Sequence, residues 1–205
     1  MKKKIKVLVI ADNPFAPSGV GTQTKYMIEG LLKTGNYSFY CLAGAIKHND
    51  YRIIQTEEYG EDFQVQPVDG YGTQELIREI INQKKPDILW FMTDPRFWTW
   101  LWEIDNEVRA KIPMVYYHVW DNYPYPDYNR KYYQSNDYVC TISKVTDDIV
   151  RHLAPELDVT RIPHTVNTEI FKKLDILEYS HLYSNPSLSA EKTIFFWNNR
   201  NARRK

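Results

Sequence analysis

A glycine-containing loop near the N-terminus is the first segment whose residue types could do chemistry. It runs from Asp12 through Ser18, Gly19 and Gly21, between a short apolar run and a segment with helical periodicity. At such a junction the first backbone N–H groups of a helix lack partners, and glycine lets a phosphate or a sugar approach without a Cβ in the way. The spacing is equally consistent with an ordinary strand-to-helix turn in which Ser18 or Thr22 caps the helix.

A histidine in the middle of the chain is the second candidate. His118 follows the apolar run that begins at Met114, and Asp121 comes shortly after it. If that run is a parallel strand, both residues lie at its carboxyl end, where ligands bind in open α/β sheets. There a histidine can donate a hydrogen bond to a substrate hydroxyl or carry a proton. The position favours such a function over a core histidine satisfied by the backbone.

Other chemistries lack their sequence signatures. The dinucleotide fingerprint fails because Thr24 takes the place of its third glycine and the second predicted strand ends without a carboxylate. The sequence has no P-loop, no nucleophile elbow around Ser143 and no histidine spacing typical of a metal site. We therefore expect no metal and no cofactor, and we interpret Ser143 as a helix N-cap.

The elements that must position these residues follow an α/β pattern. Segments rich in β-branched and aromatic residues alternate with segments whose apolar residues have helical spacing. The predicted strands are 5–11, 37–43, 87–92, 114–119, 138–142 and 160–162, with a weaker one around 63–68. Continuous apolar runs of this kind indicate a Rossmann-like, doubly wound, mostly parallel sheet flanked by helices.

Helices are predicted from apolar stripes at helical spacing. The stripes are Met27, Ile28, Leu31 and Leu32, then Leu76, Ile77, Ile80 and Ile81, then Val145, Ile149, Val150 and Leu153. The first two helices should end near Gly35 and Pro86, because a basic last turn precedes a breaker residue at both places.

The pattern changes after residue 170. From Phe171 to Glu191 the chain is polar and irregular, as in a linker, and a further strand is predicted over 193–197. We predict a Rossmann-like domain over 1–170, a linker over 171–192 and, over 193–205, the first strand of a second domain. The chain is therefore interpreted as a fragment of a longer protein.

The composition argues against several classes of protein. Lysine plus arginine equals aspartate plus glutamate at 26 each, so no net charge attracts the chain to nucleic acid. The apolar run after the basic N-terminus is too short for a signal peptide, and no segment approaches the ~20 apolar residues of a membrane span. We expect a cytoplasmic protein in which Cys41 and Cys140 stay reduced.

Four segments, which together span nearly the whole chain, resemble the family 4 glycosyltransferases of the GT-B fold. They are the Ser18-Gly-Val-Gly21 loop, His118 with Asp121, the segment Val139-Cys-Thr-Ile-Ser143-Lys, and Arg161-Ile-Pro-His-Thr-Val-Asn167-Thr-Glu-Ile-Phe171. The last is similar to the family's Ile-Pro-Asn-Gly-Val-Asp-x-x-x-Phe segment, which leads out of the N-terminal domain. The strand predicted over 193–197 is similar to the opening strand of the family's C-terminal domain.

The resemblance implies that the complete protein is a hexosyltransferase. It would transfer a sugar from a nucleotide-diphosphate sugar to an acceptor, with retention of configuration and without an essential metal. Gly19 and Gly21 would approach the donor, and His118 would contact the reacting sugar. Arg200 and Lys205 would stabilise the diphosphate, because cations suit the charge that grows on this leaving group.

The resemblance also implies what this domain contributes. A sugar or lipid acceptor would meet it, and Asp121, the second catalytic candidate, would hold that acceptor or orient His118. The isolated chain would have little activity, since half of the cleft between two domains is missing. Peripheral contact with a membrane and the oligomeric state are left open.

Departures from the family pattern keep a second hypothesis open. Thr165 stands where the family usually has glycine, Asn167 where it has aspartate, and Asn198 with Asn199 where a glycine commonly precedes the arginine. The alternative is a non-catalytic Rossmann-like binding or assembly module whose basic end serves a partner.

Overall fold

The structure is a computed structural model that describes residues 3–120, 122–175, 178, 180, 181, 193 and 195. The chain divides into two units, 1–165 and 166–205, and the fold given below is that of the first unit. Three candidate residues, Asp121, Arg200 and Lys205, lie outside the described residues, as does most of the strand predicted over 193–197. The predicted division into domain, linker and second domain stays a prediction.

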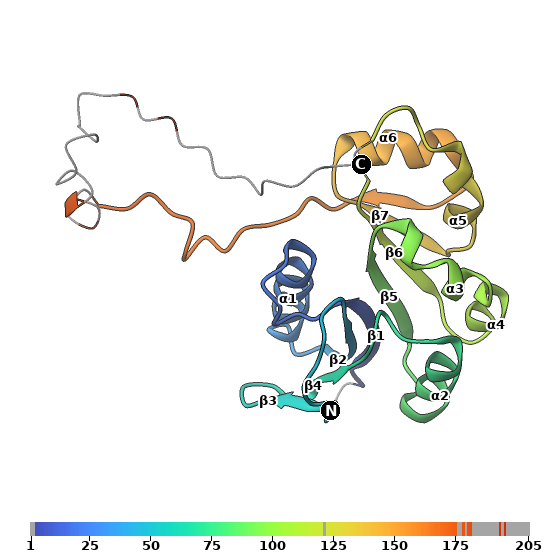
Figure 1. Cartoon of the computed structure of the whole chain (residues 1–205), viewed down its shortest axis with the longest axis horizontal. Helices are drawn as coiled ribbons and strands as arrows, with labels where there is room; N and C mark the ends of the chain where they lie inside the picture. The colour runs from blue at the N-terminus through green and yellow to red at the C-terminus, as the bar shows by residue number, and fades with distance from the viewer. Residues whose placement is uncertain are drawn as a thin grey trace. The chain divides into compact units, whose positions relative to one another are not determined.

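One eight-stranded sheet forms the centre of the described part of the first unit (Figure 1). Its strands are β1 (Ile5–Asp12), β2 (Tyr37–Gly44), β3 (Ile54–Thr56), β4 (Gly60–Pro67), β5 (Ile88–Thr93), β6 (Met114–His118), β7 (Tyr138–Thr141) and β8 (Val159–Arg161). They lie in the order β3-β4-β2-β1-β5-β6-β7-β8, and every neighbouring pair is parallel except β3 with β4. The prediction of a Rossmann-like, mostly parallel sheet is confirmed.

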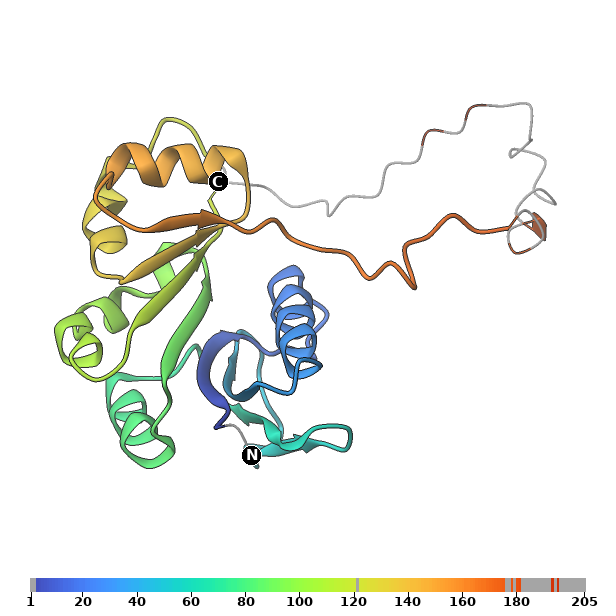
Figure 2. The same cartoon turned by 180° about the vertical axis from the view of Figure 1, so that it is seen from behind.

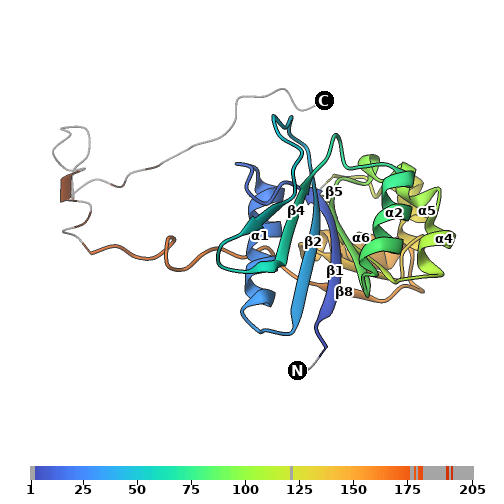
Figure 3. The same cartoon turned by 90° about the horizontal axis from the view of Figure 1, so that it is seen from below.

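Helices cover both faces of this sheet, as the view along it shows (Figure 3). On one face α1 (Gly19–Leu32) packs through Ile28 and Leu32 against Val7 and Val9 of β1. On the other face lie α2 (Gln74–Lys84), α3 (Thr99–Trp102) and α4 (Asp105–Arg109), which pack on residues such as Leu8 of β1. Alternate residues of β1 therefore enter two separate cores, which is why residues 7–11 of this strand are all apolar.

The remaining described helices lie toward the β8 side of the sheet. They are α5 (Arg130–Gln134) and α6 (Lys144–Leu153), with the short 3₁₀ helix η2 (Asp127–Asn129). Another short 3₁₀ helix, η1 (Pro95–Phe97), follows β5 and contacts the segment after β4. Ile149, Val150 and Leu153 of α6 pack with Val139 and Val159 of β7 and β8. The ribbon of α6 runs alongside these two strands (Figure 2). In the described part of the chain, no helix has the length and apolar character needed to cross a membrane.

Hydroxyl side chains fix where the longer helices begin. Ser18 accepts a hydrogen bond from the N–H of Gly21, so Ser18 and not Thr22 caps α1. Ser143 caps α6 by accepting from the N–H of Thr146, as predicted. The predicted end of α2 is also confirmed, because Lys85 follows it in the left-handed conformation at φ 49°.

Two features of the elements differ from the sequence prediction. Val145 is 54% exposed, so its place in the buried stripe of α6 is wrong. The neighbouring Thr146 is fully buried instead, because its hydroxyl donates a hydrogen bond to the backbone oxygen of Trp120. The weaker strand expected around 63–68 is β4, whereas β3 and the short helices α3, α4 and α5 have no counterpart among the predicted elements.

Candidate functional site

The candidate site lies at the carboxyl edge of the sheet, where β1 and β5 end next to each other. From β1 the chain passes through α1 to β2 on one side, whereas β5 pairs with β1 on the other side. The helix that follows β1 and the helices that follow β5 therefore lie on opposite faces of the sheet. The loops that leave the carboxyl ends of these two strands diverge as a result. This is the position in an open α/β sheet at which a ligand finds a crevice.

Asp12, the last residue of β1, is the polar centre of this edge. Its carboxylate accepts hydrogen bonds from the hydroxyl of Ser18 at 2.7 Å and from the hydroxyl of Tyr71 at 2.8 Å. The residue is 8% exposed, so the charge is held nearly out of solvent. Burial, followed by the bond to Asp12, raises the pKa of Tyr71, which therefore keeps its proton as a donor. The carboxylate is thus fixed in one orientation beside the start of α1.

Gly19 and Gly21 have different surroundings. A Cβ at Gly21 would lie 2.5 Å from the backbone oxygen of Asn13, so protein atoms already fill the space that its missing side chain leaves. A Cβ at Gly19 would meet nothing within 4 Å, and Gly19 is exposed. Gly21 therefore lets the loop close on the helix, and Gly19 is the glycine that a ligand can approach.

The first turn of α1 leaves backbone donors open at the same place. Ser18 takes up the N–H of Gly21, but the N–H groups of Gly19 and Val20 have no hydrogen-bond acceptor among the described residues. The nearby carboxylate of Asp12 offsets the positive potential at this end of the helix dipole. The pair of open donors with a carboxylate behind them suits a neutral polyhydroxyl ligand better than an isolated anion.

A cavity of about 400 Å³ opens beside this cluster. Its walls come from the segments that follow β2, β4 and β5, namely Ala45, Ile46, Lys47, Asp69, Gly70, Tyr71 and Phe97. The aromatic rings of Tyr71 and Phe97 lie 5.3 Å apart, and Phe97 is 48% exposed. The cavity therefore combines aromatic surface with a carboxylate and an ammonium group, and Tyr71 connects it to Asp12.

The end of β5 adds a second carboxylate and an unusual backbone. Thr93 has φ +152°, a conformation that side-chain-bearing residues seldom adopt. The next residue, Asp94, caps η1 through the N–H of Arg96 and pairs with the Arg96 guanidinium through two bonds of 2.8 Å. The Asp94 carboxylate is thus oriented by its own loop.

His118 is the last residue of β6, as predicted, but it has no exposed surface. Its Nδ1 lies 3.0 Å from the hydroxyl of Tyr116 and its Nε2 lies 2.9 Å from the hydroxyl of Tyr133. Burial lowers the pKa of His118 to about 3, so the ring is neutral at physiological pH. Its partners are tyrosine side chains and not the backbone groups that the alternative hypothesis expected. Direct contact with a ligand stays a prediction, which requires Tyr133 to move.

The structure thus brings Gly19 and Gly21 together with Asp12, but it leaves His118 buried in the core. The described residues include no group of three or more histidine, cysteine or acidic side chains that could hold a metal. Cys41 and Cys140 are free and buried.

The sequence analysis did not predict two residues of the site, Asp12 and Tyr71, as functional residues. Asp12 was visible there as the first polar residue after a wholly apolar run, which is the position where strands of such sheets deliver functional groups. Tyr71 lies in an irregular segment between two glycines, and no periodicity connects it to Asp12. Only the folded chain shows that pairing.

Two further cavities lie away from this edge. One of about 330 Å³ opens at the opposite edge, where Lys84 already donates to Gln64. The other, of about 410 Å³, lies between α1 and the strands β5 and β6 and is lined mainly by apolar side chains. Its polar members Gln23 and Tyr117 are bonded to the backbone of the segment after β8. Neither cavity combines the open donors and the carboxylate found beside Gly19.

Together the sheet order and the helices define a fold class, the Rossmann-like α/β domains with a mostly parallel sheet. No protein-family model matches the sequence, and no curated protein sequence matches it. A solved structure from E. coli, described as trehalose-6-phosphate bound with UDP-2-fluoro glucose, is similar with a TM-score of 0.55 and 10% sequence identity.

The match covers 89% of this chain and 54% of that one, so the chain spans about half the length of that protein. At this identity the likeness shows the fold alone, and it supports a glycosyltransferase-like fold of the GT-B type.

Proposed function

We propose that this chain is the acceptor-side domain of a retaining glycosyltransferase that uses a nucleotide-diphosphate sugar and needs no metal. The observation that carries the proposal is the arrangement of Asp12 with the open N–H groups of Gly19 and Val20 at the β1–β5 edge. The GT-B-type fold is consistent with it. Sugars are recognised by hydroxyl contacts to carboxylates and backbone groups, and this edge offers both.

The acceptor would occupy the cavity lined by Tyr71 and Phe97. An aromatic ring can cover the apolar face of a sugar, while Asp69 and Lys47 supply an acceptor and donors for its hydroxyls. The volume of about 400 Å³ lies within the usual range of small-ligand sites. We favour a sugar over a lipid chain here because charged side chains line the cavity.

The donor would approach Gly19 from the solvent side. Its sugar hydroxyls would donate to Asp12, and backbone N–H groups of the first turn of α1 would donate to its oxygens. The diphosphate needs cationic partners, and these are assigned to Arg200 and Lys205 by family resemblance. His118 would stand behind the reacting sugar, and Asp121 would hold the acceptor or orient His118.

Nuclear magnetic resonance of the ¹⁵N-labelled 205-residue chain tests the location of the site. Free hexoses, disaccharides and the UDP-, GDP- and ADP-sugars are added in turn. We expect backbone amide signals of Gly19, Val20 and Gly70 to shift in a saturable way, and Asp12→Asn to reduce the shifts. Saturable shifts confined to other segments, or none with any sugar, would contradict this location.

The rival hypothesis is a non-catalytic binding or assembly module with the same fold. It predicts that the complete protein releases no nucleotide from any sugar donor even where the domain binds a carbohydrate. Turnover by the complete protein would exclude it.

A further inference from the structure

His118 connects two tyrosines and, through them, two further elements. It contacts the hydroxyls of Tyr116 and Tyr133, and all three side chains are fully buried. Tyr116 lies 2.7 Å from the backbone oxygen of Thr93, and the amide of Asn129 lies 3.5 Å from the hydroxyl of Tyr133. The chain of hydrogen bonds therefore runs from η2 and α5 through β6 to the end of β5.

The number of protons available sets the direction of every bond in this chain. A backbone oxygen can only accept, so the single hydroxyl proton of Tyr116 goes to Thr93. Tyr116 can then only accept from His118, which places the imidazole proton on Nδ1. In the neutral ring Nε2 has no proton, so it accepts from Tyr133. Tyr133 in turn accepts from the amide of Asn129.

The electrostatic surroundings agree with a neutral ring. Tyr116 and Tyr133 are in contact with His118, and Asp94 is the carboxylate that acts on it at longer range. Burial lowers the pKa of His118 despite the opposing effect of Asp94. Burial also raises the pKa values of both tyrosines, so each keeps the proton that it donates.

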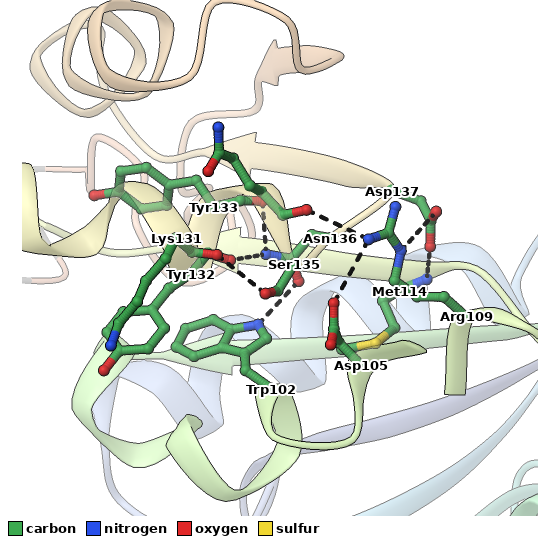
Figure 4. Close-up of polar contacts among 11 residues, drawn as sticks. Trp102, Asp105, Arg109, Met114, Lys131, Tyr132, Tyr133, Ser135, Asn136 and Asp137 are labelled. Carbon is green, nitrogen blue, oxygen red and sulfur yellow. Dashed lines mark hydrogen bonds and ion pairs between the residues drawn. The ribbon is translucent and has the colours of Figure 1, made fainter. Parts of the chain in front are cut away.

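The backbone of Tyr133 is held in place from just beyond the end of α5 (Figure 4). The fully buried side chain of Asn136 donates to the backbone oxygen of Tyr133 at 3.1 Å and accepts from the indole N–H of Trp102 at 3.3 Å. The neighbouring Asp137 accepts from the N–H of Met114, the first residue of β6, at 2.8 Å. The helix that carries Tyr133 is thus fixed to the strand that carries His118.

We propose that His118 is a positioning residue, held as the Nδ1–H tautomer, which offers Nε2 as an acceptor and joins α5 to the end of β5. That end needs support, because Thr93 is β-branched and its φ of +152° is unfavourable. Tyr116 holds the Thr93 oxygen, and His118 fixes the Tyr116 hydroxyl. The segment so held continues into η1, whose Phe97 lines the candidate acceptor cavity.

One consequence for ligand chemistry rests on the proposed function. A sugar that displaced the Tyr133 hydroxyl would have to donate a proton to Nε2 of His118, because Nε2 has none to give. This is the opposite direction to the sequence expectation, in which His118 donates to a substrate hydroxyl.

Imidazole nitrogen resonances of the ligand-free 205-residue chain test the proposal, with His118→Gln used for assignment. We expect a protonated Nδ1 and an unprotonated Nε2. Tyr133→Phe should keep this tautomer and move the Nε2 signal toward that of a nitrogen without a hydrogen bond. Tyr116→Phe should convert a measurable fraction to the Nε2–H form, since Nδ1 loses its acceptor. Tyr132→Phe, on the same helix, should change neither signal.

A protonated Nε2 in the wild-type protein would overturn the proposal, and so would a tautomer change in Tyr133→Phe but not in Tyr116→Phe. The wild-type spectrum decides the matter even where a variant does not fold. Because no ligand is present, the result is independent of glycosyl transfer. An inactive complete protein would contradict the proposed function and leave the tautomer assignment intact.

Discussion

The side-chain amide of Gln23 forms two hydrogen bonds with the backbone of Thr165. Its Nε2 donates to the oxygen of Thr165 at 2.8 Å, and its Oε1 accepts from the N–H of Thr165 at 3.1 Å. A glutamine side chain in α1 therefore pairs with the segment after β8 as a neighbouring strand would. This pairing holds the end of the first unit beside the first turns of α1.

Replacing that amide tests how firmly the segment is held. Gln23→Leu keeps the approximate size of the side chain but removes both bonds, including the acceptor of the Thr165 N–H. We expect amide hydrogen exchange at Thr165 to accelerate roughly 2- to 10-fold, which corresponds to the ~0.5–1.5 kcal/mol of an ordinary hydrogen bond. Gln83→Leu, at an exposed position in α2, is the control. Equal exchange in both variants would contradict the role of Gln23.

Three glycine-to-alanine substitutions in α1 separate packing from ligand access. Gly21→Ala should destabilise the domain, because the new Cβ would lie 2.5 Å from a backbone oxygen that cannot move freely. Gly30→Ala meets open space and should stabilise it by about 0.5–1 kcal/mol through helix propensity. Gly19→Ala should fold normally and weaken only sugar binding. Urea unfolding and the amide titration described above measure both effects.

The result for Gly19 distinguishes the two sequence hypotheses for this loop. Weakened sugar binding with unchanged stability supports a ligand pocket. Unchanged binding in Gly19→Ala would favour an ordinary strand-to-helix turn.

The buried His118 makes stability depend on pH. Burial lowers its pKa in the folded protein to about 3, whereas an unfolded histidine titrates near ~6.5. Below about pH 6.5 the unfolded state binds a proton that the folded state rejects, so stability falls as the pH drops toward about 3, by up to ~1.4 kcal/mol per pH unit. Above that range the histidine has no effect.

Urea unfolding at about pH 7 and about pH 5 measures this dependence. The loss of stability at the lower pH should be clearly smaller in His118→Gln than in the wild type. His164→Gln is the matched control, because partial burial lowers the pKa of His164 in the same direction and its contribution should be smaller. An unchanged pH dependence in His118→Gln would show that the ring is not buried in its neutral form.

The buried amide of Asn136 should be among the most sensitive polar positions of the domain. Asn136→Ala removes the partner of the Trp102 indole N–H and the partner of the Tyr132 backbone oxygen, whereas the Tyr133 oxygen keeps its bond from the backbone N–H of residue 136. Each buried group left without a partner costs ~1–3 kcal/mol, so we expect a loss of several kcal/mol in urea unfolding. Asn106→Ala, at an exposed position in α4, should change stability by no more than about 0.5 kcal/mol. Similar losses in both variants would contradict this role.

The sequence was sufficient to predict the sheet because its strands are buried on both faces. The run over residues 7–11 is continuously apolar for that reason, and the same holds for most of β2, β5 and β6. Strand β3 could not be predicted, because three largely exposed residues carry no burial pattern. The short helices were missed because their buried residues, such as Trp102 and Tyr133, are too few to form a stripe.

The candidate site was only partly predictable. Position along the chain identified Gly19, Gly21 and His118 as residues at the ends of predicted strands. It could not separate a glycine that faces solvent from one packed on its own loop, since that depends on where the oxygen of Asn13 lies. Nor could it show that Tyr133 would occupy Nε2 of His118, because that contact depends on how α5 packs.

Nucleotide release by the complete protein tests the central claim most directly. A panel of UDP-, GDP- and ADP-sugars is assayed with sugar acceptors for the wild type, for Asp12→Asn and for the exposed control Asp158→Asn. We predict release from at least one donor, a roughly 10- to 100-fold fall in kcat/KM for Asp12→Asn and no change for Asp158→Asn. Absence of release with every donor, or equal rates in all three proteins, would contradict a glycosyltransferase site at this edge.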